Sequence, residues 1–308
     1  MNSLSIVEGT EPPVDRPLSL PKTQPFYWSV RRELWEYRSI YIAPLAVAGL
    51  VVFGFLFRLA TLPLATLATA SLPATAQTPN LDRPYAFAAA AIAFCGLIVA
   101  AFYCLGALNN ERRDRSILFW KSLPVSDLTA VLAKACMPLV ALPLVVLAIS
   151  IATQLVMLIL GSGVLLVNGL NPATIWTHWP MIQMSLLLFY ALAIGTLWYA
   201  PLYGWLLMVS GWARRVPILW AVLPPLGLCV VEKIGFDTTH IASLLIYRLR
   251  GFLVEGFAPP AHGTPVIDPL VLLAPGKFLA SPGLWLGLIA AAGFLAATVW
   301  LRRYREPS

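Results

Sequence analysis

Residues 85–134 read YAFAAAAIAFCGLIVAAFYCLGALNNERRDRSILFWKSLPVSDLTAVLAK, and they join a long apolar stretch directly to a charged one. Residues 85–108 contain no Asp, Glu, Lys, Arg or His. A helix of about 20 apolar residues crosses a bilayer core about 30 Å thick, so this stretch is long enough to span it. The charged residues that follow must then lie at a membrane face, where the chain turns back toward a second apolar stretch.

The rest of the chain repeats this pattern. Of its 308 residues, 59% are hydrophobic and 11% are charged, and the mean hydropathy is +0.79. Soluble domains hold about 25% charged residues, so the composition predicts an all-α integral membrane protein. We expect one transmembrane domain over residues 26–305, with six spans at about 40–57, 85–108, 135–160, 181–210, 217–231 and 283–301. Residues 1–25 are rich in proline and are expected to form a disordered cytoplasmic lead-in.

The distribution of basic residues predicts the orientation of these spans. With both termini on one side, that side holds fifteen of the 21 Lys and Arg residues, including those of 109–134, and the other side holds six. Basic residues are enriched on the cytoplasmic side, so both termini and residues 109–134 are predicted to be cytoplasmic and the connection 232–281 external. The formal net charge of +7 has the same origin; no basic stripe interleaved with aromatic residues suggests nucleic-acid binding.

Residues 26–41 predict an amphipathic helix before the first span. Its apolar positions recur at helical spacing and share one face: Val30, Leu34, Tyr37 and Tyr41. The charged residues are expected to lie mostly away from that face: Arg31, Arg32, Glu33 and Glu36. A helix lying flat in the headgroup zone would contact lipid through Trp28, Arg31, Arg32 and Trp35. The alternative is a plain basic flank of the first span.

Residues 109–134 are the second charged feature. Residues 114–120 predict a short helix that Pro124 prevents from continuing, and Ser126 is placed as the N-cap of the third span, with Asp127 in its first turn. The alternative is that the run ERRDR only anchors the orientation of the spans. That alternative leaves unexplained the four apolar residues Ile117, Leu118, Phe119 and Trp120, which could insert into a groove of a partner protein.

The motifs of enzymes are missing from the sequence. The centres of the six predicted spans lack Asp, Glu, Lys, Arg and His, and the chain contains no HExxH, GxSxG or GxxxxGK[ST] motif. The four cysteines lie in apolar stretches without a CxxC pair, so no metal site is expected. A membrane enzyme would have to use residues of the external connections, of which these are the candidates: Glu232, Asp237, His240, Glu255, His262 and Asp268.

Two apolar segments leave alternatives open. The fourth span carries aromatic residues around Pro201, and Trp198, Tyr199 and Tyr203 either line a path for an apolar or amphipathic substrate or pack around a proline kink. Residues 241–253 are apolar but contain Arg248 and Arg250, and they form either a re-entrant helix or a helix lying on the surface of the bundle.

The sequence ERRDRSILFWKSLPVSDLTAVLAK at residues 111–134 resembles the loop between spans two and three of ABC-2 type transporter permeases. The number of spans, the amphipathic segment before the first span and the long segment between spans five and six are similar to that family in architecture. The resemblance implies a cytoplasmic coupling helix at 109–134 and short external helices between spans five and six. It implies that the coupling helix contacts an ATPase through Arg112, Arg113, Asp114, Arg115, Ser116, Phe119, Trp120 and Lys121.

The resemblance also implies a role and partners. The chain would be the permease subunit of an ATP-driven exporter in a bacterial inner (plasma) membrane. It would pair with a second permease copy, as a homodimer or a heterodimer. It lacks a nucleotide-binding motif, so ATP and Mg²⁺ would be bound by a separate cytoplasmic ABC ATPase, and this chain would not be an enzyme. The alternative is a non-transporting membrane scaffold or assembly factor whose loop binds another cytoplasmic protein.

Overall fold

The computed structural model describes residues 24–61, 83–113, 126–258 and 269–304, and these residues are almost entirely helical, without a β-strand among them. Within them, six helical stretches are long and apolar enough to cross a membrane, which indicates a multi-pass membrane protein. These stretches are Ser39–Thr61, Arg83–Arg113, Asp127–Val167, Met181–Trp212, Pro217–Phe236 and Pro282–Tyr304. The predicted helix at 114–120 lies outside the described residues.

Five of these stretches lie close to the predicted positions. They are formed by α2 (Ser39–Thr61), α4 (Arg83–Gly106) with α5 (Asn109–Arg113), α10 (Met181–Trp212), α11 (Pro217–Phe236) and α14 (Pro282–Tyr304). The third stretch begins earlier than the predicted residue 135. It consists of α7 (Asp127–Cys136), the π-helical turn η2 (Met137–Ala141) and α8 (Leu142–Val167). The helix begins after Ser126, whose Oγ accepts a hydrogen bond from the Thr129 N–H at 3.1 Å, as the N-cap prediction required.

The interior of this third helix changes its winding at prolines. Pro138 lies in η2 and Pro143 follows at the start of α8. Proline donates no backbone hydrogen bond and crowds the preceding turn, and a wider π-turn is a common way for a helix to accommodate such a break. The third helix therefore carries a local irregularity between its charged beginning and its long apolar part.

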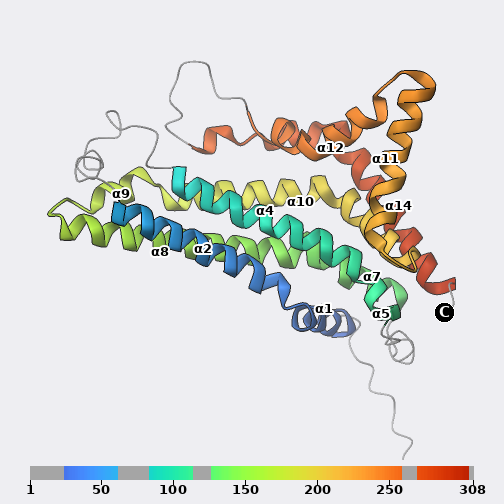
Figure 1. The fold of residues 1–308 in the computed structure, drawn as a ribbon, viewed down its shortest axis with the longest axis horizontal. Coiled ribbons are helices and arrows are strands. Elements are labelled where there is room, and N and C mark those ends of the chain that lie inside the picture. The colour runs from blue at the N-terminus through green and yellow to red at the C-terminus, as the bar shows by residue number, and fades with distance from the viewer. Residues whose placement is uncertain (1–23, 62–82, 114–125, 259–268, 305–308) are drawn as a thin grey trace, which may run out of the picture.

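Helices α2, α4, α8 and α10 run side by side and form the main bundle (Figure 1). Helix α14 packs closely along α10 at Gly204, where a Cβ atom would lie 3.2 Å from Phe294 Cβ and 3.3 Å from the Ala291 carbonyl oxygen. Gly204 therefore permits a close approach of the two helices. Helix α11 runs across the direction of the bundle (Figure 1), and much of its apolar surface is exposed.

Helix α12 (His240–Gly256) packs along the middle of α10. The Trp198 indole N–H donates to the Arg248 carbonyl oxygen and the Tyr199 hydroxyl donates to that of Leu249, both at 2.8 Å. Residues 241–253 thus form a helix held against the bundle by side chains of α10. The short elements η3 (Pro269–Leu272) and α13 (Pro275–Ala280) follow, and Phe278 of α13 packs near Trp198.

Candidate functional site

Two regions of the molecule have the chemistry expected of a functional site. One is a buried group of charged side chains, which we call the ion-pair cluster. It lies where α5, α7 and the C-terminal end of α14 meet, next to α1 (Gln24–Glu36) (Figure 1). The other is an apolar cavity in the bundle. The ion-pair cluster consists of Arg32, Glu33, Glu111, Asp127, Lys134 and Arg302.

Lys134 is the centre of the ion-pair cluster. Its Nζ lies 2.8 Å from Glu33 Oε1 and 3.0 Å from Glu111 Oε1. Glu33 and Lys134 are each 2% exposed and Glu111 is 6% exposed, so water reaches none of the three to any extent. One ammonium group therefore joins α1, α5 and α7, whose side chains come from distant parts of the sequence.

Two arginines complete the cluster. Arg32 Nη2 lies 2.9 Å from Glu33 Oε1 and 3.0 Å from Glu111 Oε1. Arg302 of α14 reaches Glu111 Oε2 through Nη1 and Asp127 Oδ1 through Nε, both at 3.0 Å. These six residues balance in charge, and Arg32 Nε also lies 3.6 Å from Oε2 of Glu36, whose side chain is 53% exposed. In the part of the chain that the structure describes, no group of three or more His, Cys, Asp or Glu side chains is arranged to hold a metal ion.

Tyrosines pack against the cluster and share its hydrogen bonds. The Tyr103 hydroxyl donates to Glu33 Oε2 at 2.8 Å, and the Tyr103 ring meets that of Tyr37 edge-on at 4.8 Å. Asn110 Nδ2 donates to the Tyr37 hydroxyl at 3.4 Å. Burial, together with the neighbouring Glu33 carboxylate, raises the pKa of Tyr37 to about 12, so this phenol stays neutral at physiological pH.

The ion-pair cluster specifies the relative positions of the helices more than it stabilises the fold. Taking charges out of water costs several kcal/mol per ion, and mutual attraction repays this only when the partners are well placed. Removing one partner, however, leaves an uncompensated buried charge and costs about 3–5 kcal/mol. The cluster therefore favours one relative arrangement of α1, α5, α7 and α14 over others.

Arg112 has a related role at the end of α10. Its guanidinium donates to the carbonyl oxygens of Ser210 and Ala213, the second at 2.9 Å. The Ser210 Oγ in turn accepts from the backbone N–H groups of Leu108 and Asn109, both at 3.1 Å. A cation at the C-terminal end of a helix satisfies its last carbonyl groups and interacts favourably with the negative end of the helix dipole.

The predicted partner-binding residues are therefore placed in different ways. Arg112 turns toward α10 of its own chain, whereas Arg113 is exposed. The other residues of that set lie outside the described residues: Asp114, Arg115, Ser116, Phe119, Trp120 and Lys121.

The predicted amphipathic helix exists as α1, but its charged residues do not all face outward. The helix ends at Glu36, earlier than the predicted residue 41; Val30 and Leu34 on α1, and Tyr37 just after it, pack against the core, as predicted. The prediction was wrong for Tyr41, which is exposed on α2, and for Glu33, which is buried. Glu33 can be buried because Lys134, Arg32 and Tyr103 supply its counter-charges and hydrogen bonds.

The outer face of α1 retains aromatic and basic side chains. Arg31 lies over the rings of Trp28 and Trp35, with its guanidinium carbon 5.2 and 5.1 Å from the two centroids, and both indoles are exposed. Such a cation–π arrangement suits a headgroup zone. Arg32, predicted for the same face, instead binds the carboxylates of the ion-pair cluster.

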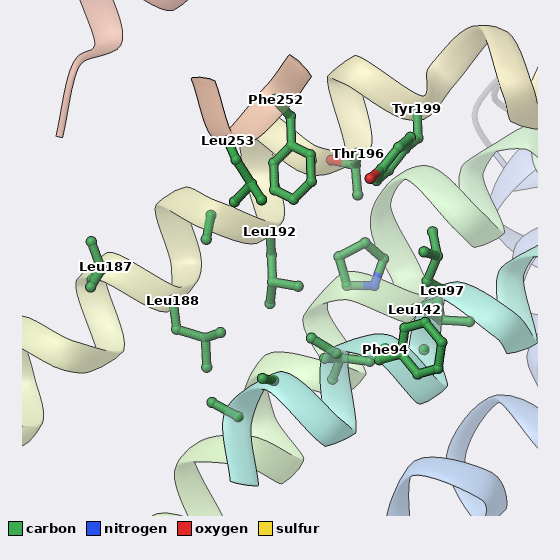
Figure 2. Close-up of a pocket in the computed structure, with 18 of the residues that line it drawn as sticks. Phe94, Leu97, Leu142, Leu187, Leu188, Leu192, Thr196, Tyr199, Phe252 and Leu253 are labelled. Atoms are coloured by element: carbon green, nitrogen blue, oxygen red, sulfur yellow. The ribbon is translucent and has the colours of Figure 1, made fainter. Parts of the chain in front are cut away.

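The second region is a cavity of about 690 Å³ between α4, α8, α10 and α12. Leu188 and Leu192 of α10, Phe94 and Leu97 of α4, and Phe252 and Leu253 of α12 surround it (Figure 2). Among the described residues that line it, none is charged. Pro138 of η2 and Leu142 of α8 belong to its wall, so the irregular part of the third helix borders the cavity.

Two buried polar side chains in the cavity wall are only partly satisfied. Gln154 Nε2 donates to the Tyr85 carbonyl oxygen at 3.4 Å, and Trp179, just after α9 (Ala173–His178), stacks on the Tyr85 ring at 5.1 Å. Among the described residues, neither Gln154 Oε1 nor Trp179 Nε1 has a hydrogen-bond partner. An unsatisfied buried group costs about 1–3 kcal/mol, so two in one wall call for an explanation.

The three aromatic residues predicted on the fourth span have different surroundings. Tyr199 and Tyr203 line the cavity. Trp198 does not belong to the lining; it is fully buried against α12, and Gly251 approaches it so closely that a Cβ atom there would lie 2.5 Å from the indole. Trp198 therefore serves packing, and the two tyrosines remain candidates for contact with a ligand.

Sequence reasoning missed the central residues of both regions. Glu33 shares a helical face with Val30, Leu34 and Tyr37, and Lys134 lies within the apolar sequence AVLAKACMP. A charge on an apolar face and an opposite charge in another apolar segment are together the signal of a buried pair. Gln154 carried a similar signal, because an amide in the middle of an apolar span needs a partner.

Comparisons of the chain with protein-family models, with curated proteins and with solved structures find no match. The functional argument therefore rests on the sequence and on the two regions described above.

Proposed function

We propose that this chain is the permease subunit of an ATP-driven exporter of the ABC-2 type, coupled through residues 109–134 to a separate ATP-binding subunit. The observation that carries the proposal is that the ion-pair cluster holds both flanks of the segment 114–125. Glu111 precedes that segment, and Asp127 and Lys134 follow it. A partner that moved this segment would pull on α1, α5, α7 and α14 together.

A continuous route leads from that segment to the cavity. Helix α7 begins at Asp127 and continues through η2 into α8, and Pro138, Leu142 and Val146 on this route line the cavity. Elements with two discrete arrangements carry coupling between distant sites, and a π-turn that contains Pro138 and is followed by Pro143 is a place where a helix can change its winding. The route thus connects a docking segment to a space that could hold cargo.

The remaining features of the proposal follow from the same arrangement. Both termini and residues 109–134 would be cytoplasmic in a bacterial inner membrane, α1 would lie in the headgroup zone, and α12, η3 and α13 would be the short helices between the fifth and sixth spans. ATP and Mg²⁺ would be bound by the ATPase partner. A second permease copy would complete the transporter, and the exposed apolar side chains of α11 offer surface for such a contact.

The experiment is reconstitution of the full-length chain with candidate ABC ATPase subunits, first as a complex in mild detergent and then in proteoliposomes. We expect the permease to stimulate ATP hydrolysis. The double variant Arg113→Glu/Trp120→Ala should weaken the complex about tenfold or more, the equivalent of about 1.4 kcal/mol of binding free energy. The matched control is Arg214→Glu, an exposed arginine in the turn between α10 and α11, which should leave the complex intact.

Two results would refute the proposal. One is the absence of a complex with any ABC ATPase; the other is a complex in which the Arg113→Glu/Trp120→Ala variant hydrolyses ATP as the unmodified chain does. A complex with a cytoplasmic protein that hydrolyses no ATP would instead identify the chain as a membrane scaffold.

A further inference from the structure

The cavity described above has the properties of a binding site for a particular class of small molecule. Its volume of about 690 Å³ lies within the range of ligand pockets, about 300–1,000 Å³. A water molecule takes about 30 Å³ in the liquid, so the cavity holds on the order of 20 non-hydrogen atoms. That is the size of a single fatty chain with a small head group, and it is too small for a phospholipid with two chains.

The exposed part of the cavity lining on α4 and α12 is apolar. Phe94 is 64% exposed, Leu249 56% and Leu253 55%, and all three line the cavity. Phe94 and Leu253 approach it from opposite helices (Figure 2). A rim of exposed large apolar side chains on membrane-spanning helices favours entry from the lipid phase over entry from water.

The wall of the cavity also indicates the head group. None of the described lining residues is charged, so a charged head group would find no counter-ion and would lose its hydration. Gln154 and Trp179, 2% and 4% exposed, carry one unpaired acceptor, Gln154 Oε1, and one unpaired donor, Trp179 Nε1. Both atoms are covered by protein in this structure, so a ligand reaches them only when the two side chains turn toward the cavity. Both side chains contact Tyr85, so the two free atoms belong to the same part of the wall.

We propose that this cavity binds a neutral, single-chain amphiphile whose head group both donates and accepts a hydrogen bond, as an alcohol or a primary amide does. On binding, the Gln154 amide and the Trp179 indole turn toward the cavity, the head group donates to Gln154 Oε1 and accepts from Trp179 Nε1, and the hydrocarbon chain lies among Leu188, Leu192 and Leu97. The inference deepens the proposed function, because such a molecule would be the cargo, and in that respect it rests on that function. Binding itself requires no ATPase, so the two can fail separately.

Gly195 provides a clean way to close the cavity. It lines the cavity from α10, and a Cβ atom added there would meet no other atom within 4 Å. Gly163 of α8 is also helical and equally free of neighbours, but it does not line the cavity. Gly195→Leu therefore fills the site without a clash at its Cβ, and Gly163→Leu is its matched control.

The experiment measures photolabelling of the full-length chain in phosphatidylcholine nanodiscs by a diazirine derivative of oleyl alcohol. Three competitors have the same hydrocarbon chain and differ in the head group. The head group of oleyl alcohol donates and accepts hydrogen bonds, that of methyl oleate only accepts, and that of oleate is charged. We expect labelled peptides from α4, α10 and α12. We expect oleyl alcohol to compete about tenfold better than methyl oleate, the effect of one hydrogen bond, and oleate to compete least.

Variants then assign the head-group contacts. Gln154→Leu should weaken competition by oleyl alcohol about five- to tenfold and abolish its preference over methyl oleate, whereas Trp179→Phe should weaken competition by both molecules about equally. Trp176→Phe is the control for Trp179, because the Trp176 indole N–H already donates to Ser162 Oγ at 3.0 Å and Trp176 does not line the cavity. Gly195→Leu should abolish displaceable labelling, and Gly163→Leu should preserve it.

Three outcomes would overturn the proposal. Equal competition by oleyl alcohol and methyl oleate would exclude recognition of the head group, and stronger competition by oleate would exclude a neutral ligand. Labelling that oleyl alcohol does not displace, or that Gly195→Leu leaves unchanged, would mean that bulk lipid and not a specific ligand is labelled. A melting curve of each variant in detergent shows that a loss of labelling is not a loss of folding.

Discussion

The ion-pair cluster and the apolar cavity treat buried polar groups in opposite ways. In the cluster, the carboxylates of Glu33 and Glu111 each lie within 3.0 Å of basic nitrogens from more than one helix. In the cavity wall, Gln154 Oε1 and Trp179 Nε1 have no partner among the described residues. A satisfied network specifies one arrangement of its helices, whereas two unsatisfied groups on residues that line a cavity could be satisfied by a ligand if their side chains turn toward it.

The third membrane-spanning helix connects these two regions. Its beginning contributes Asp127 and Lys134 to the cluster, and its middle contributes Pro138 and Leu142 to the cavity. The contrast therefore lies along one helix, between a firmly held end and an irregular middle. Three substitutions test this contrast, and a fourth, at Arg112, tests the neighbouring contact between α5 and the end of α10. Each is measured by unfolding of the purified chain in detergent.

The largest effect is expected from Lys134→Met. Without the ammonium group, Glu33 and Glu111 remain buried side by side with less compensation, so the free energy of unfolding should fall by about 3–5 kcal/mol. The control is Lys233→Met, which removes an ion pair with Asp237 whose side chains are 58% and 88% exposed. An exposed pair contributes about 0–1 kcal/mol. If the free energy of unfolding fell equally in the two variants, the cluster would not hold the beginning of the third helix in place.

A smaller loss is expected from Arg112→Met. This variant leaves the carbonyl groups of Ser210 and Ala213 at the end of α10 without their charged donor, which should lower the free energy of unfolding by about 2–3 kcal/mol. Arg113→Met changes an exposed neighbour and should stay within about 0.5 kcal/mol of the unmodified chain. If Arg113→Met were the more destabilising of the two, the assignment of Arg112 to the α10 end would be wrong.

A substitution that fills the cavity should raise the free energy of unfolding instead of lowering it. Gly195→Leu replaces a helical glycine and fills open space, so the free energy of unfolding should rise by about 1 kcal/mol or more. Gly163→Leu increases helix propensity without filling the cavity, so its free energy of unfolding should rise by less. A destabilised Gly195→Leu variant would mean that the space is not available to a side chain.

The smallest effect is expected from Gln154→Leu. This change removes one long hydrogen bond to Tyr85 and also one unsatisfied acceptor, and the two contributions should cancel to within about 0.5 kcal/mol. A polar group retained for a ligand is dispensable for folding, whereas Lys134 is not. A loss of 2 kcal/mol or more, on the scale of a broken buried network, would assign Gln154 to structure instead.

Much of the architecture could be predicted from local sequence. The six spans follow from uncharged stretches of sufficient length, the start of α7 from the N-cap Ser126, and the inner face of α1 from the spacing of Val30 and Leu34. The predicted positions of charged residues were wrong where a charged side chain is buried. Lys134 was placed outside the third span, and Glu33 was placed on the outer face of α1, because a single sequence does not show that the two side chains meet 2.8 Å apart.

The sequence by itself determined that this is a multi-pass helical membrane protein, because hydropathy and helical periodicity are local properties that few contacts can override. Only the tertiary structure decided that Glu33, Glu111, Asp127, Lys134, Arg32 and Arg302 converge, that Arg112 holds the end of α10, and that Trp198 packs against α12 while Tyr199 lines a cavity. These features depend on side chains from distant segments that come together only when the helices pack. Whether a buried charge is paired and whether an apolar wall encloses space are therefore properties of the assembled bundle.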